Sequence, residues 1–355
     1  MLRSEHPLYL AQLQALVEEE NLPWETLRGI RILITGATGM LGSCLVDLLM
    51  EANRLKQLGI SVYAMGRSRQ RGKARFAKNW EDPLFCFIEQ DLCEKTWKPL
   101  EPVTYIVHAA SNADPISFAR FPVETLQANL WATEQLLTLA KEWKHCRLLF
   151  VSSGEMYGQM PPGSGPMIET DCGTIDHSSA RSCYPVGKRA AEVLCQCFLN
   201  EYGVDSVIAR PCHLYGPTMT DTDSRAIAQF VRNAVDKQPI VMKSKGEQDR
   251  TWCYVTDAAC GLLYILLRGQ RGQAYNVADL QSRATVRSIA EQTAQAGGTE
   301  VVFALPSETE KAGYTPITHA VLDPGKLQSL GWKARVPLAA GLATTIQVLR
   351  EEKDA

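Results

Sequence analysis

A tyrosine and a lysine stand four residues apart in Tyr184-Pro-Val-Gly-Lys188, and this pair could perform acid–base chemistry. On a helix the two side chains share one face. A tyrosine with its ordinary pKa of about 10 is a poor base at neutral pH. A nearby ammonium stabilises the phenolate and lowers that pKa, so the phenolate could take a proton from an alcohol. Taken alone, this spacing is common on helices that have no catalytic role.

Two further polar side chains follow an apolar strand, in Val151-Ser-Ser-Gly-Glu-Met-Tyr-Gly158. Doubly wound sheets place their chemistry at the carboxyl ends of their strands. There the hydroxyl of Ser153 can hydrogen-bond a reacting oxygen, and Glu155 can act as an acid or a base. We therefore predict that Ser153, Glu155, Tyr184 and Lys188 form a catalytic set.

Three glycines, Gly36, Gly39 and Gly42, come directly after an apolar strand and open a helix. Without side chains they let the backbone approach a pyrophosphate and let the helix pack closely on the sheet. The phosphates would lie at the positive N-terminus of that helix. This context predicts a dinucleotide-binding turn, and the alternative is a glycine-rich turn without a ligand.

The end of the second predicted strand bears on the choice between NAD and NADP. An acid there binds the ribose 2′-hydroxyl of NAD, whereas an arginine favours the 2′-phosphate of NADP. The chain reads Met65-Gly-Arg-Ser-Arg69, without an acid. We therefore expect NAD(P) as cofactor with a preference for NADP through Arg67. The alternative is that these arginines belong to a solvated loop.

Alternating strands and helices must position these residues. Apolar runs predict strands over 30–35, 60–65, 85–88, 105–109, 147–152 and 206–210, and helices over 43–58, 122–142 and 185–202. This alternation predicts an α/β fold, namely a Rossmann-type doubly wound parallel sheet with helices on both faces. The less regular spacing after residue 185 predicts a smaller C-terminal substrate-binding lobe.

Three parts follow from this pattern. Residues 1–29 form an N-terminal helical extension, in which leucines recur at helical spacing until Pro23 ends the pattern. This extension is either a structural cap or a subunit contact. Residues 30–185 form the NAD(P)-binding Rossmann domain, and 186–355 form mainly the substrate-binding lobe, with segments that return to the sheet.

Composition excludes several classes of partner. The 355 residues include 37 Lys plus Arg and 39 Asp plus Glu, so the net charge of −2 offers no basic surface for nucleic acid or an anionic membrane. We expect no metal site, because the six histidines show no ligand spacing. The eleven cysteines, without a Cys-x-x-Cys pair or a secretory signal, predict reduced thiols in a cytoplasmic protein.

Several motifs, taken together, resemble the extended short-chain dehydrogenase/reductase family. They are the glycine turn, His108-Ala-Ala-Ser111, Asn129, Ser152-Ser153, and Tyr184 with Lys188. Within that family the chain is similar to the NAD(P)-dependent nucleotide-sugar epimerases, dehydratases and decarboxylases. Two later segments, 210–217 and 250–257, extend the resemblance, which covers about residues 30–348 and leaves the N-terminal extension outside.

The resemblance implies a reaction that starts by oxidation at C4 of a nucleotide-diphosphate sugar. Tyr184 would take the hydroxyl proton beside Ser153 while hydride passes to the nicotinamide, and Lys188 would also hold the nicotinamide ribose. Asp91 resembles the acid that contacts adenine, unless it caps a helix. The cofactor contacts implied in this way are Gly36, Thr38, Gly39, Met40, Leu41, Gly42, Arg67, Asp91, Leu92, Ala109, Ala110, Ser111, Asn129, Tyr184, Lys188 and Pro211.

The triplet Ser153-Gly154-Glu155 distinguishes the branches of this group. Dehydratases acting on dTDP-glucose usually carry an Asp at the position of Gly154, where it protonates the departing hydroxyl. The segments around Arg181, Gly187-Lys-Arg189 and Asp223-Ser-Arg225 resemble the UDP-glucuronate decarboxylases, which we place narrowly first.

The substrate-binding residues expected from the resemblance include Arg250, because a guanidinium grips a diphosphate bidentately. The alternative for Arg250 is a surface salt bridge, and the alternative for His213 is a packed polar residue. The full expected set is Ser111, Glu155, Arg181, His213, Arg225 and Arg250. Three departures concern recognition of the substrate: His213 replaces an Asn, Lys243 replaces a Tyr near the nucleobase, and 318–323 replace an arginine-containing stretch.

Two other functions remain open. One is a reductase of a 4-keto sugar or another carbonyl, with net consumption of NADPH. The other is a non-catalytic NADP-sensing binding protein, which the fold alone does not exclude. The family commonly forms homodimers through two helices, and residues 115–143 and 185–202 are the equivalents here, so we expect a homodimer.

Overall fold

The computed structural model describes residues 2–18, 21–94, 96–97, 100–306 and 317–354. Its main sheet has seven strands, all parallel, in the order β10-β6-β5-β4-β1-β2-β3. This order runs outward from β1 in both directions, which is the doubly wound arrangement that the sequence predicts. The strands are β1 (Arg31–Thr35), β2 (Ser61–Gly66), β3 (Phe85–Glu89), β4 (Tyr105–His108), β5 (Arg147–Val151), β6 (Asp205–Pro211) and β10 (Ala274–Val277).

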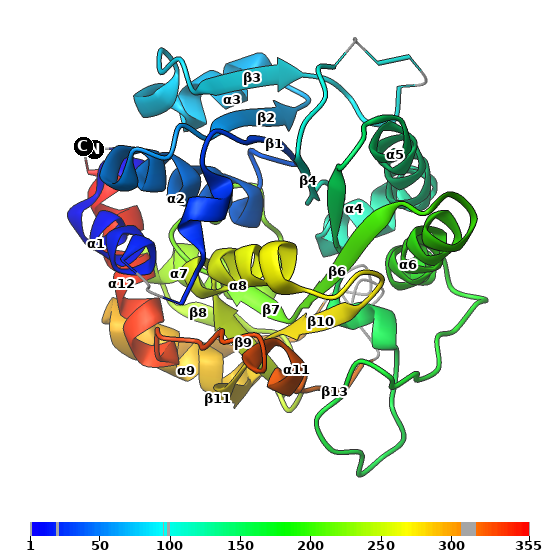
Figure 1. Ribbon diagram of the computed structural model, residues 1–355. Helices are drawn as coiled ribbons and strands as arrows, with labels where there is room; N and C mark the ends of the chain where they lie inside the picture. Colours follow the sequence, from blue (N-terminus) through cyan, green and yellow to red (C-terminus); the bar gives the residue numbers. More distant parts are fainter. Residues whose placement is uncertain (1, 19–20, 95, 98–99, 307–316, 355) are drawn as a thin grey trace.

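Helices cover both faces of this sheet (Figure 1). Successive side chains of a strand point to opposite faces, so Ile32 and Ile34 enter one core and Leu33 enters the other. The first core lies under α2 and α8, and the second lies under α5 and α6. These helices are α2 (Met40–Lys56), α5 (Pro122–Glu142), α6 (Cys183–Tyr202) and α8 (Val255–Arg268).

The predicted strands are found with bounds that agree to within one residue. The helix predicted over 122–142 has the predicted bounds, whereas α2 and α6 start earlier than predicted, at Met40 and Cys183, so Tyr184 lies in the first turn of a helix rather than in a loop. The remaining short elements are α3 (Arg69–Arg75), α4 (Pro115–Arg120), α11 (Gly325–Gln328) and the 3-10 helices η1 (Arg3–Glu5), η2 (Trp24–Leu27), η3 (Ala77–Asn79), η4 (Gly154–Tyr157) and η5 (Ala180–Ser182).

A second, smaller lobe is built from later segments. Its four-stranded sheet centres on β9, which pairs with β7 and β13 in parallel and with β11 in an antiparallel manner. Helices pack on it around a separate core that includes Trp252, Tyr254 and Ile346. The elements are α7 (Ala226–Val235), α9 (Val286–Gly297), α12 (Leu338–Lys353), β7 (His213–Tyr215), β8 (Ile240–Met242), β9 (Asp249–Tyr254), β11 (Asp279–Thr285), β12 (Val301–Phe303) and β13 (His319–Ala320).

The N-terminal extension packs onto the body of the protein. Its helix α1 (Pro7–Val17) buries Tyr9, Leu13 and Leu16 in the same core as α2 and α8. Figure 1 shows α1 (blue) beside α2 and α12 (red), with the two ends of the chain close together. These residues therefore pack against the body of their own chain.

Candidate active site

The three glycines form a tight turn between β1 and α2, and two of them leave no room for a side chain. Gly36 has a φ of 64°, and a Cβ atom on it would lie 2.7 Å from the backbone of Ala110. A Cβ atom on Gly42 would lie 2.4 Å from the carbonyl oxygen of Gly36. Gly39 is the N-cap of α2, whose first amides have no acceptor within the helix. The turn therefore fits the pyrophosphate of a dinucleotide.

Other predicted cofactor residues surround this turn. Met40 and Leu41 begin α2, and Thr38 lies beside Gly66 at the end of β2. Across the turn, the segment after β4 carries Ala109, Ala110 and Ser111. The hydroxyl of Ser111 donates to Oδ1 of the buried Asn129 at 3.0 Å, which fixes this segment to α5. The other predicted contact, Pro211, is the last residue of β6.

The ends of β2 and β3 carry the residues predicted to contact the adenosine half of the cofactor. Arg67 is exposed directly after β2, and Leu92 is buried after β3. The carboxylate of Asp91 accepts from the backbone N–H of Cys93 at 2.9 Å, within a turn and not at a helix N-terminus. The cation of Arg67 acts on the same Cys93, where it lowers the thiol pKa that burial raises.

Tyr184 and Lys188 lie on one face of the first two turns of α6, as the spacing predicts. The Tyr184 ring is 7% exposed and stacks on Phe118 with ring centroids 4.6 Å apart. The ammonium of Lys188 lies 5.9 Å from the centroid of the Tyr184 ring and donates to the carbonyl oxygen of Val151 at 2.8 Å. The pair therefore sits at the carboxyl end of β5.

Burial dominates the electrostatics of this pair. It raises the pKa of Tyr184 to about 12 and lowers the pKa of Lys188 to about 7. The sequence predicts that Lys188 lowers the pKa of Tyr184. In the structure, a hydrogen bond with Ser153, followed by the charges of Arg225 and Arg181, opposes the effect of burial on the phenol. The hydroxyl of Ser153 and two arginines thus stabilise the phenolate, which we expected one lysine to do, and the charge of Glu155 opposes them.

Ser153 and Glu155 flank the start of η4 beside this pair. The hydroxyl of Ser153 accepts from the backbone N–H of Glu155 at 3.1 Å, so η4 holds both side chains in place. The Glu155 carboxylate accepts from Nη2 of Arg181 at 2.9 and 3.2 Å. Between them, a Cβ atom on Gly154 would lie 3.0 Å from the Leu322 side chain. An acidic side chain at this position would therefore displace Leu322.

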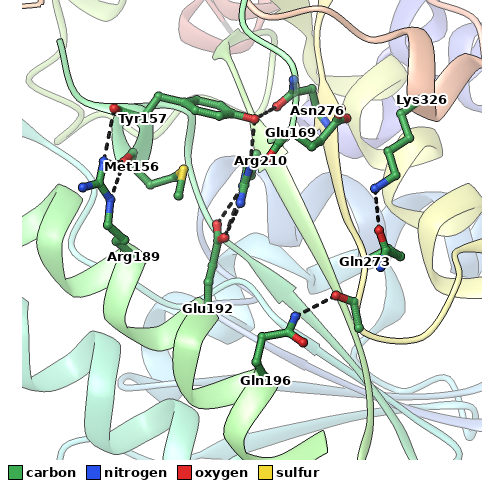
Figure 2. Close-up of polar contacts among 11 residues, drawn as sticks. Met156, Tyr157, Glu169, Arg189, Glu192, Gln196, Arg210, Gln273, Asn276 and Lys326 are labelled. Atoms are coloured by element: carbon green, nitrogen blue, oxygen red, sulfur yellow. Dashed lines mark hydrogen bonds and ion pairs between the residues drawn. The ribbon is translucent and has the colours of Figure 1, made fainter. Parts of the chain in front are cut away.

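A buried polar network fixes the far end of η4, and we did not predict it (Figure 2). The guanidinium of Arg210 donates to the Glu192 carboxylate at 2.6 Å and to the hydroxyl of Tyr157 at 2.9 Å. That hydroxyl donates to Oδ1 of Asn276 at 2.7 Å, and the backbone N–H of Asn276 donates to Glu169 at 2.8 Å. The network joins η4 to α6, β6 and β10.

This network supports the catalytic residues indirectly. Tyr157 is the last residue of η4, and Glu192 lies one turn after Lys188 on α6, where its charge raises the lysine pKa against the effect of burial. Buried charges are retained when they are paired and hydrogen-bonded, as Arg210 and Glu192 are. One feature of the sequence could have indicated this network: Arg210 begins the segment 210–217, which carries the family resemblance.

Arg250 and His213 form a second polar pair, on the substrate-lobe side. Arg250 is 6% exposed, and its Nη1 lies 2.7 Å from Nε2 of His213. Since a guanidinium only donates, Nε2 accepts and the imidazole is neutral. Burial and the charges of Arg250 and Arg225 lower the pKa of His213 well below its ordinary value. Arg250 is therefore a buried residue in contact with His213. The alternative interpretation of Arg250, a surface salt bridge, does not describe it.

Arg225 connects the substrate lobe to the phosphate turn. Its guanidinium pairs with Asp223 at 2.6 Å and donates to the carbonyl oxygen of Leu214 at 3.0 Å. The same group lies 3.7 Å from the sulfur of Met40, at the start of α2. Thr218 donates to the carbonyl oxygen of Met40 at 2.8 Å. The predicted substrate residue Arg225 therefore lies beside the predicted cofactor turn.

Three further features concern the described residues as a whole. Among the described residues, no group of three or more His, Cys, Asp or Glu side chains is placed to hold a metal ion. All eleven cysteines are free thiols. None of the described helices has the length and apolar character that a membrane span requires.

A doubly wound sheet, a glycine turn that fits a pyrophosphate, and Ser153, Tyr184 and Lys188 at the sheet's carboxyl edge define a nicotinamide-dependent enzyme of the Rossmann type. The sequence model of the NAD dependent epimerase/dehydratase family matches residues 32–278, and the chain belongs to this family. The predicted fold class, family and enzyme class are thus confirmed.

Similar proteins include several decarboxylases. The chain is 31% identical to UDP-glucuronic acid decarboxylase 1 of Xenopus tropicalis over 327 residues, which is 91% of this chain and 72% of that protein. It is also 31% identical to UDP-glucuronic acid decarboxylase 5 of Arabidopsis thaliana, over 88% of this chain and 87% of that one.

Solved structures show the same fold. A dTDP-glucose 4,6-dehydratase double mutant from Streptomyces venezuelae, with NAD bound, superposes with a TM-score of 0.77 at 25% identity, over 92% of this chain and 98% of that one. A UDP-glucuronic acid 4-epimerase from Bacillus cereus, in complex with UDP-glucuronic acid and NAD, has a TM-score of 0.77 at 22% identity, over 91% of this chain and all of that one.

Proposed function

We propose that the enzyme decarboxylates UDP-glucuronate through a transient 4-keto sugar and recycles its nicotinamide cofactor. The observation that carries this proposal is the Glu155–Arg181 pair beside Tyr184, next to a glycine where a dehydratase would need an acid. The guanidinium of Arg181 in this place suits a substrate that carries its own carboxylate. The similarity to UDP-glucuronic acid decarboxylases supports the same choice.

The chain's own groups account for the proton movements of this reaction. The bound nicotinamide would supply the hydride acceptor and, at the end, the hydride donor. Tyr184 takes the proton of the C4 hydroxyl, whose oxygen Ser153 hydrogen-bonds. The resulting ketone accepts the electron pair of the breaking bond between C5 and the carboxylate carbon, and carbon dioxide leaves. A proton from solvent, relayed by Glu155, then adds to C5 in place of the lost carboxylate, and Tyr184 gives its own proton back to the C4 oxygen.

Arg250 and Arg225 are the cations we assign to the substrate diphosphate. Arg250 is buried, and the effect of burial lowers its pKa, so a dianionic ligand would relieve the cost of burying its charge. Arg225 lies beside the phosphate turn and acts on Tyr184. His213, which accepts from Arg250, would orient that guanidinium, and we assign Ser111 to the sugar side of the same site.

We propose a preference for NADP over NAD. Its support is the exposed cation of Arg67, which follows β2 directly. No acidic residue stands between the end of β2 and Ser68, the N-cap of α3. An exposed guanidinium at this position suits a 2′-phosphate. Titration calorimetry with NAD and NADP should show tighter binding of NADP in the wild-type enzyme and a loss of that difference in Arg67→Ala. Tighter binding of NAD to the wild-type enzyme would contradict the preference.

We also propose that the enzyme forms a homodimer through α5 and α6. We further propose that it is located in the cytoplasm. The two helices expose large apolar side chains, with Val123 at 61%, Trp131 at 44% and Val193 at 57% exposure. Apolar groups gathered on neighbouring helices are typical of a protein interface. The free thiols support the reducing compartment.

The reaction is tested by incubation with a panel of UDP-, GDP-, CDP- and dTDP-sugars that includes UDP-glucuronate. We expect loss of carbon dioxide from UDP-glucuronate, read by mass spectrometry, with a catalytic amount of cofactor. Exchange of the C5 proton without loss of mass would indicate an epimerase. Stoichiometric oxidation of NADPH, seen by its absorbance, would indicate a carbonyl reductase and would contradict the proposal.

A further inference from the structure

Arg3, in the N-terminal extension, reaches the substrate lobe. Its Nη1 donates to the carbonyl oxygen of Met219 at 2.5 Å, and its Nη2 pairs with Asp221 at 2.9 Å. The side chain of Arg3 is 17% exposed, and Met219 is buried. Asp221 is 87% exposed, so its ion pair contributes little to stability, whereas the bond to a buried carbonyl is shielded from water.

Arg3 is itself held by other parts of the extension and by the C-terminal helix. Its Nε forms an ion pair with Glu352 of α12, and the neighbouring His6 contacts Glu351 at 2.9 Å. Further along, the hydroxyl of Tyr9 donates to Asp47 in the middle of α2 at 3.0 Å. The guanidinium is therefore a fixed point and not a mobile surface side chain.

The residues that Arg3 contacts belong to the Arg225 segment, which we define as residues 216–225. Within this segment Thr218 donates to Met40 of the phosphate turn at 2.8 Å, and Ser224 donates to Asp114, before α4, at 2.7 Å. The segment ends at Arg225, whose charge acts on Tyr184. One loop thus contacts the cofactor turn and the start of α4, and its last residue acts through its charge on the catalytic phenol.

We propose that Arg3 is a positioning residue, which holds the Arg225 segment against the phosphate turn and so places Arg225 for the nucleotide sugar. The contact of Arg225 with substrate rests on the proposed function, whereas the order of the segment does not. The N-terminal extension, which lies outside the family resemblance, thereby becomes part of the support of the active site in this chain.

The test replaces Arg3 by Ala in the full-length protein and reads the segment directly. The amides of Met219 and Asp223 donate within the segment, to Gly216 and Thr220, both at 3.1 Å. Hydrogen exchange of these amides, measured by mass spectrometry without substrate, should become about tenfold faster in Arg3→Ala. The KM for the nucleotide sugar should rise by a similar factor, with the Kd for the dinucleotide nearly unchanged.

Two matched variants serve as controls. Arg28→Ala removes an exposed ion pair with Glu25 in the same extension, and Asp221→Asn removes only the exposed partner of Arg3. Both should exchange like the wild type. Unchanged exchange in Arg3→Ala, or acceleration spread evenly over the whole protein, would overturn the proposal. Faster exchange in a protein that converts no UDP-sugar would refute the proposed function and leave the positioning role standing.

Discussion

At the residue scale, burial acts in opposite directions on the two ionisable groups of the catalytic helix. It favours the neutral phenol of Tyr184 and the neutral amine of Lys188. A base that must become a phenolate therefore depends on groups from other elements, namely the hydroxyl of Ser153 and then the charges of Arg225 and Arg181. Local spacing identified the acid–base pair, and tertiary structure supplies its charge environment.

Replacing Tyr184 by Phe should remove turnover and leave the fold intact. The change deletes one oxygen and keeps the ring that stacks on Phe118. Since a positioned acid–base group typically contributes about 10²- to 10⁴-fold, we expect kcat to fall by about that factor. Dinucleotide binding, measured by calorimetry, should stay near the wild-type value.

The matched control is Tyr202→Phe, at the exposed end of the same helix, which should turn over substrate normally. If Tyr184→Phe retains full activity, Tyr184 is not the proton acceptor.

The contact between His213 and Arg250 shows what residue-level reasoning could not provide. The two residues are 37 positions apart and meet because β7 and β9 pair in parallel, with His213 opposite Trp252. Each was a candidate by type and by resemblance, but their 2.7 Å contact depends on a strand register that no local pattern encodes. The sequence could thus identify the candidate residues individually, but it could not predict which of them contact each other.

At the scale of elements, the parts with strong periodicity were predictable. Buried parallel strands are continuous apolar runs, and the glycine turn marks the junction of β1 and α2. The sequence predicted that later segments return to the sheet but not which ones. The strand β10 pairs with β6 and the helix α8 packs in the first core, although both follow substrate-lobe strands in sequence. The buried network around Arg210 was not predictable either, because its hydrogen bonds join residues that are far apart in the sequence.

The first turn of α8 gives a prediction about pH. Asp257 is 1% exposed and accepts from the backbone N–H groups of Arg335 and Val336, both at 2.9 Å. Burial raises the pKa of Asp257 to about 6, above its unfolded value of about 4. Between these two pH values the folded state binds more protons than the unfolded state. The contribution of Asp257 to stability therefore falls as pH rises from about 4 to about 6, by about 3 kcal/mol in all.

Asp257→Asn keeps an acceptor for both amides and removes the titration. The free energy of unfolding of this variant, measured by urea denaturation, should increase relative to that of the wild type as pH rises from 4 to 7. Asp236→Asn, on the surface, should show no such trend. A constant difference between Asp257→Asn and wild type at every pH would contradict the assignment.

At the scale of the whole molecule, the helices on the two faces of the sheet differ in what covers their outer surfaces. Helix α1 covers the α2 and α8 side, whereas the outer surface of α5 and α6 carries Trp131 and Val193 exposed. An isologous dimer through α5 and α6 would bury these side chains on both protomers.

Replacing Trp131 by Lys should convert the proposed dimer to a monomer. An unpaired ammonium at the centre of such an interface costs several kcal/mol, about 10²-fold or more in dissociation constant. Sedimentation velocity at micromolar protein would show the change. The control is Leu55→Lys, which places the same charge on α2, where Leu55 is 40% exposed. A wild-type protein that sediments as a monomer would contradict the dimer itself.

The contacts of Arg3 and His6 with Glu352 and Glu351 have a practical consequence for protein engineering. Because they bring the two ends of the polypeptide together, a short peptide linker could join them, and new ends could be opened in an exposed loop such as 161–166. Such a circular permutant would keep the sheet and both lobes. It would also show that the order of the segments along the chain can change while their arrangement in space is preserved.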